Sequence, residues 1–141
     1  MRATLLIALL ASTFWSAGAS AEPSYIQKMT GFPAACQIDA MYQQAEVDSA
    51  ARKFGEGSQD WSKAFHTRLD ALRSCIDGAK DKGKLLYKAE VASKPDLKHQ
   101  LSEMYIAWLD YLDHLIDEDR DTFESTYEQA ANRLKAELDA S

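Results

Sequence analysis

Carboxylates are the side chains in this sequence most able to do chemistry. The 141 residues hold 22 Asp and Glu against 16 Lys and Arg, with three histidines and two cysteines. A carboxyl group works as a general acid only where burial raises its pKa, and these acids fall on the outward faces of the expected helices. The sequence has no nucleophile elbow, zinc-protease motif, phosphate-binding loop or dinucleotide-binding motif. We therefore expect a binding protein rather than an enzyme.

One acidic segment has a spacing that could bind a metal ion. Its oxygen ligands would be Asp117, Asp119, Asp121, Ser125 and Glu128, at positions 1, 3, 5, 9 and 12 of a loop. Over this segment the spacing resembles the calcium loop of an EF-hand. The segment departs from that loop at Thr122, where the loop needs glycine, and at Glu124, where an apolar residue is usual. The other interpretation is an acidic first helical turn that complements the helix dipole. We expect no cofactor, and calcium is the alternative.

A second acidic group follows the outer face of the helix expected between Pro95 and Ile116. Its members share the face opposite the apolar stripe of that helix, and they are Glu103, Ile106, Asp110, Asp113, His114 and Asp117. We expect them to form a docking surface for a basic protein, with Ile106 as an apolar anchor. A zinc site at Asp110, His114 and Asp117 has weaker support, because only one of its ligands is a histidine. A solvated helix face is the third interpretation.

The first 21 residues have the pattern of a secretory signal peptide. Arg2 precedes an apolar run from Leu5 to Trp15, and Ala19-Ser20-Ala21 supplies small residues for cleavage before Glu22. Removing these residues, which carry one base and no acid, leaves 120 residues with a net charge of −7. We expect export to the periplasm or secretion, without membrane insertion of the mature chain. The acidic balance also disfavours nucleic acid as a partner.

Helical periodicity accounts for nearly all of the mature sequence. After an irregular leader at 22–32, we expect helices at Pro33–Phe54, Gln59–Ile76 and Pro95–Ile116, and a last helix that ends near Asp139. A polar connector at 78–83 and a short fifth helix at Lys84–Ala92 complete the pattern. The first helix has two apolar stripes on nearly opposite faces, which predicts neighbours on both sides. One of these stripes comprises Ala34, Ile38, Met41, Tyr42 and Ala45, and the apolar stripe of the last helix comprises Phe123, Tyr127, Ala130, Leu134 and Leu138. Residues 33–141 should form a single domain, an all-α antiparallel bundle of four long helices.

The two cysteines support this topology. Cys36 and Cys75 lie at equal distances from the turn at Gly55-Glu56-Gly57, so the two arms of an antiparallel hairpin would bring them side by side. In an oxidising compartment such a pair forms a disulfide. We expect this disulfide to join the open end of the first hairpin.

Charge, size and compartment together predict a small exported protein that binds a protein partner. An immunity or inhibitor protein that neutralises a basic toxin or hydrolase of the cell envelope fits all three properties. The alternatives are a calcium-binding or small-ligand-binding helical protein, and an envelope-stress or chaperone-like protein. The oligomeric state is left open.

Overall fold

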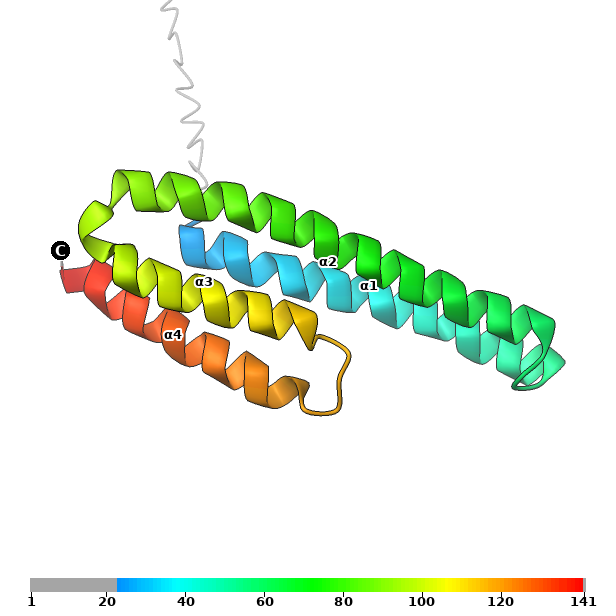
Figure 1. Ribbon diagram of the computed structural model, residues 1–141. Helices are drawn as coiled ribbons and strands as arrows, with labels where there is room; N and C mark the ends of the chain where they lie inside the picture. The colour runs from blue at the N-terminus through cyan, green and yellow to red at the C-terminus, as the bar shows by residue number, and fades with distance from the viewer. Residues whose placement is uncertain (1–22, 141) are drawn as a thin grey trace, which may run out of the picture.

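The computed structural model describes residues 23–140, which form four α-helices. These are α1 (Tyr25–Phe54), α2 (Gln59–Ser93), α3 (Lys98–Asp113) and α4 (Arg120–Ala140), with a 3-10 turn, η1 (Pro95–Leu97), before α3. Neighbouring helices run antiparallel and no strand occurs in residues 23–140, so the predicted all-α bundle is confirmed (Figure 1). The predicted signal peptide at 1–21 lies outside the described residues. None of the helices that the structure describes has a stretch apolar and long enough to cross a membrane.

The two helical hairpins differ in length, and this difference shapes the molecule. At 1.5 Å per residue, α1 and α2 are about 45 and 52 Å long, whereas α3 and α4 are about 24 and 31 Å long. Helices α3 and α4 therefore pack beside only part of the first hairpin, and its turn projects beyond them as a two-helix arm (Figure 1). The α3–α4 connection lies beside the middle of the long hairpin.

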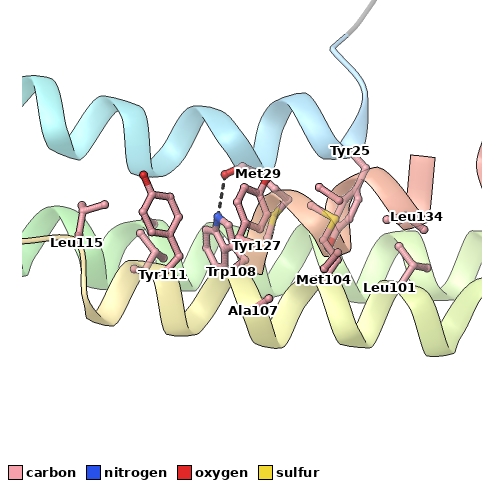
Figure 2. Packing of buried hydrophobic residues seen from close by; sticks show 14 of the residues in the cluster. Tyr25, Met29, Leu101, Met104, Ala107, Trp108, Tyr111, Leu115, Tyr127 and Leu134 are labelled. Atoms are coloured by element: carbon pink, nitrogen blue, oxygen red, sulfur yellow. Dashed lines mark hydrogen bonds between the residues drawn. The ribbon is translucent and has the colours of Figure 1, made fainter. Parts of the chain in front are cut away.

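The main core lies between the four helices, and most of its buried side chains come from α1, α3 and α4 (Figure 2). The predicted apolar stripe of α3 is buried, and so are three members of the predicted stripe of α4. The completely inaccessible side chains include Leu101, Met104, Trp108, Leu112 and Leu134. Residues at intervals of three and four share one helix face. The sequence pattern was therefore sufficient to identify the faces that α3 and α4 contribute to this core.

The irregular leader predicted at 22–32 is wrong for most of its length. Helix α1 begins at Tyr25, where Ser24 and Gln27 form a capping box in which each side chain binds the other residue's backbone N–H. Pro33, which the sequence placed in the first turn, lies inside the helix and is fully buried. The bundle therefore starts at Tyr25 instead of at Pro33.

A tertiary hydrogen bond explains how α1 accommodates Pro33. Proline has no N–H, so the carbonyl of Met29, four residues earlier, lacks its normal partner in the helix. The indole Nε1–H of Trp108 on α3 donates a 2.8 Å hydrogen bond to that carbonyl (Figure 2). The backbone group that Pro33 leaves unpaired is thus satisfied by a buried side chain of another helix.

This arrangement predicts energetic coupling between Pro33 and Trp108. Trp108→Phe leaves the buried Met29 carbonyl without a donor, at an expected cost of about 1–3 kcal/mol beyond the change in ring size. In a Pro33→Ala background, the N–H of residue 33 can donate a hydrogen bond to the Met29 carbonyl. Trp108→Phe should therefore lower the free energy of unfolding less in that background than in the wild type. Urea unfolding of the two single variants and the double variant measures the coupling. If the changes in the free energy of unfolding were strictly additive, the proposed replacement of the Trp108 donor by the residue 33 N–H would be contradicted.

The predicted connector at 78–83 and the separate short helix at Lys84–Ala92 are also wrong. Both segments belong to α2, which continues without a break to Ser93. Two glycines suggested an interruption, but Gly83 faces the core, and its missing side chain makes room for the ring of Trp108. Packing therefore outweighs the low helix propensity of glycine at this position.

The chain leaves α3 earlier than the pattern indicates. The predicted helix extended to Ile116, but α3 ends at Asp113, and His114 follows as its C-cap. Leu115 is nonetheless buried and Ile116 is half exposed. The apolar periodicity continues past the helix end because Leu115, in the connection, still contributes to the core.

The predicted disulfide between Cys36 and Cys75 is present, with a Cα–Cα distance of 5.7 Å. It does not join the open end of the hairpin, because α1 begins three turns before Cys36, at Tyr25, and α2 continues far beyond Cys75, to Ser93. The bond instead crosses the middle of the hairpin. Cys36 is almost completely buried at this point and belongs to the core.

Candidate protein-binding surface

The acidic residues predicted on α3 do not form one continuous surface. Glu103, Ile106 and Asp110 are exposed on the outer side of the helix, and 59% of Ile106 is accessible. Asp113 forms an ion pair with Lys80 of α2. The structure thus keeps the first three residues together as an exposed group and directs Asp113 toward a different neighbour.

His114 and Asp117 separate from this group as well. The ring of His114 is half-buried and stacks on Phe123, with ring centroids 3.7 Å apart. Its Nδ1 lies 2.8 Å from the carbonyl oxygen of Asp110. Asp117 lies in the α3–α4 connection, beside α1 and α2. His114 therefore packs at the end of α3 instead of projecting from the predicted face.

The residues predicted for calcium are not gathered either. Asp117 and Asp119 lie in the connection, whereas Asp121, Ser125 and Glu128 belong to α4, which begins at Arg120. Asp121 accepts hydrogen bonds from Arg120. In residues 23–140 no group of three or more acidic, histidine or cysteine side chains is arranged to hold a metal ion. Calcium coordination of the EF-hand type would require the first turns of α4 to unwind.

The largest exposed apolar feature near the acidic residues is on α1, where the sequence predicted burial. Ile38, Met41 and Tyr42 belong to a stripe assigned to a second neighbouring helix, but they are 54%, 73% and 72% exposed. We call these three residues the α1 patch. None of the other described segments covers it. Exposed apolar side chains that cluster in this way are typical of interaction sites.

A recess beside the α1 patch lies between the long hairpin and the α3–α4 connection. Its volume is about 320 Å³, and Met41, Leu72 and Ile116 form its apolar wall. Asp117 and Arg68 add charged groups, and the Nε of Arg68 is buried without a hydrogen-bond partner. This donor has no acceptor among the described residues, and the pairing it lacks is a carbonyl or carboxylate oxygen.

A second recess, between α1 and α4, extends the surface toward the start of α1. Its polar lining includes Tyr111 and Tyr127 together with Glu124 and Glu128, and no basic side chain lines it. Gln37 lines both recesses, so they are adjacent on α1. The two glutamates make this recess suitable for a cationic side chain.

Hydrogen bonds from α1 hold the two tyrosines of the second recess in place. Gln37 Nε2 donates to the hydroxyl of Tyr111 at 2.9 Å. Thr30 gives its own proton to the Ile26 carbonyl, so Tyr127 donates to Thr30 Oγ1 at 2.7 Å. Burial, with a further contribution from the negative charge of Glu124, raises the pKa of Tyr111 to about 12. Burial also raises the pKa of Tyr127, so both phenols stay neutral at physiological pH.

The charge along α1 is one-sided near the α1 patch, whereas the adjoining recess also contains Arg68 and Arg120. From Met29 to Ala51 the chain has no basic residue, and its acids are Asp39, Glu46 and Asp48. Arg120, the basic residue nearest the α4 side, lies close to the carboxylates of Asp121 and Glu124. The result is an apolar centre with an acidic margin, which is the arrangement of an interface anchor surrounded by a polar rim.

Comparisons with known proteins add no relative. No protein-family model matches the chain, and neither the curated proteins nor the solved structures contain a match.

Proposed function

We propose that this protein is an exported binding protein that recognises a basic protein partner through the α1 patch and its acidic margin. The observation that carries the proposal is the exposure of Ile38, Met41 and Tyr42 on a helix face that is free of basic residues. Large apolar side chains supply most of the affinity of an interface. Surrounding carboxylates accelerate association with a cationic partner and disfavour acidic ones.

The two recesses next to the α1 patch each offer a binding position for a different group of the partner. The α1–α4 recess, with Glu124 and Glu128, offers a place for a lysine or arginine of the partner. The recess beside Met41 offers the guanidinium of Arg68 to a backbone carbonyl or carboxylate of the same partner. Glu103, Ile106 and Asp110 on α3 provide a separate acidic face that we assign to the same kind of partner.

The partner class that fits best is a basic enzyme or toxin of the cell envelope, with this protein as its inhibitor or immunity protein. The predicted signal peptide and the disulfide suit an oxidising compartment outside the cytoplasm. An inhibitor of this kind needs a rigid recognition surface because preorganisation lowers the entropic cost of binding. The disulfide and the hydrogen bonds from Gln37 and Thr30 help to hold α1 in a fixed position.

Paired substitutions of equally exposed apolar residues test this proposal. Met41→Asp should weaken binding to the partner about 30-fold, because the loss of a central apolar anchor costs about 2 kcal/mol. Leu85→Asp adds the same charge at a site with 69% exposure on α2, and it should bind as the wild type does. Proteins retained from the native cell envelope by each immobilised variant are compared by quantitative mass spectrometry, at low and high salt.

The expected result is a basic protein that Met41→Asp fails to retain, that Leu85→Asp retains, and that high salt releases. Ile106→Asp then reports whether the α3 face contacts the same protein. Equal retention by the Met41 and Leu85 variants, or an acidic partner, would overturn the proposed surface. Retention of many unrelated unfolded proteins, insensitive to salt, would instead support the chaperone-like alternative.

A further inference from the structure

A second apolar feature lies between the start of α1 and the second half of α2, away from the α1 patch. It is an open groove of about 600 Å³, within the size range of small-molecule sites. Phe32, Leu85 and Leu86 supply much of its apolar surface. Phe32 rests edge-on against the buried ring of Trp108, so the groove has a rigid base. Leu85 is 69% exposed at its edge.

The groove is lined by basic side chains, although the chain as a whole is acidic. Lys28 and Lys82 line it from opposite helices. The segment from Lys80 to Lys98 contains six lysines and three acids, whereas the whole chain has a net charge of −6. Lys82 is exposed and has no ion-pair partner among the described residues. An apolar surface with a cationic edge is complementary to a ligand that has an apolar body and an anionic head.

Gly31 keeps the groove open. Glycine inside a helix costs about 1 kcal/mol relative to alanine, and Gly31 is the helical glycine that lines the groove. Gly83 is needed because Trp108 occupies the space of its side chain, and Gly55 and Gly57 have positive φ angles. At Gly31 a Cβ would have no atom within 4 Å, and the residue lines the groove. A side chain at this position would enter the groove without meeting the rest of the protein.

We propose that this groove binds the acyl chain of a single-chain anionic amphiphile, with a fatty acid as the ligand class. The chain lies against Phe32, Leu85 and Leu86, and the carboxylate meets the ammonium group of Lys82. The site is independent of the α1 patch, and neither binding event requires the other.

Two pairs of variants test the site. Gly31→Leu fills the groove, whereas Gly78→Leu places the same side chain on α2, where a Cβ also has no neighbour within 4 Å, outside the groove. Lys82→Glu reverses a charge at the groove, and Lys63→Glu makes the same change on the projecting arm. Isothermal titration with dodecanoate, below the concentration at which it forms micelles, measures binding to the mature chain.

We expect saturable binding of one dodecanoate to the wild type. Gly31→Leu and Lys82→Glu should each weaken it at least tenfold, while Gly78→Leu and Lys63→Glu leave it within twofold of the wild type. Gly31→Leu should melt at or above the wild-type temperature, since leucine is the better helix former, so its loss of binding would not reflect unfolding.

Four results would overturn the proposal. They are the absence of saturable binding, wild-type affinity in Gly31→Leu, equal affinity for the neutral dodecyl maltoside, and binding only to phosphatidylglycerol-containing vesicles but not to dodecanoate. The last result would identify a membrane surface as the occupant. None of these results bears on the partner of the α1 patch, because Met41 lies outside the groove.

Discussion

Gly83→Ala should destabilise the protein by about 2 kcal/mol, although alanine is the better helix former. A Cβ at residue 83 would lie 2.3 Å from Cη2 and 2.6 Å from Cζ3 of the Trp108 ring. Trp108 is completely buried and its Nε1 is bonded to the Met29 carbonyl, so the ring cannot move aside without losing that hydrogen bond. Overpacking a core costs about 1–3 kcal/mol or more, and the fixed ring places this substitution at the upper end of that range. The higher helix propensity of alanine offsets about 1 kcal/mol of this cost. Urea unfolding followed by circular dichroism measures the difference.

Gly78→Ala is the matched control for this prediction. It makes the same change earlier in α2, where a Cβ would have no neighbour within 4 Å. This variant should be more stable than the wild type by about 0.5–1 kcal/mol. Trp108→Phe removes the ring atoms nearest residue 83 and should reduce the cost of Gly83→Ala in a double-mutant cycle. If both glycine variants were stabilised, the close approach of α2 to Trp108 would be incorrect.

Loss of the Cys36–Cys75 disulfide should lower the free energy of unfolding by about 4 kcal/mol. The bond joins residues separated by 39 positions and so restricts the unfolded chain. That effect is a large fraction of the roughly 5–15 kcal/mol by which a typical domain is stable. It also joins α1 to α2 within the part of the hairpin that packs against the core, where Cys36 is buried.

Reduction and substitution provide two measurements of this effect. Urea unfolding of the wild type with and without dithiothreitol should show the full loss on reduction. The Cys36→Ala/Cys75→Ala variant should match the reduced protein or fall slightly below it, because Cys36 is buried and its truncation leaves a small cavity. Dithiothreitol should not change this variant. An unchanged midpoint for the reduced wild type would show that the bond contributes little to stability.

The proposed binding surface was only partly predictable from the sequence. Glu103, Ile106 and Asp110 are exposed as expected, since their positions oppose the apolar stripe of α3. Ile38, Met41 and Tyr42 were assigned to the core because a second apolar stripe usually means a second neighbour. Periodicity shows that a helix face is apolar, but it does not show whether another helix of the same chain covers that face.

Local patterns alone determined the helical class, the core faces of α3 and α4, the turn at Gly55–Gly57 and the cysteine pairing. Each depends on residues close in sequence or on the symmetry of one hairpin, so no distant contact is needed to infer them. Tertiary structure decided that Pro33 lies inside α1 and that α2 continues through Gly83. Local propensity opposes a helix at both positions, and both are accommodated by the same distant residue: Trp108 bonds the carbonyl that Pro33 leaves free and fills the space that Gly83 leaves empty. Only the folded chain brings residues 33, 83 and 108 together.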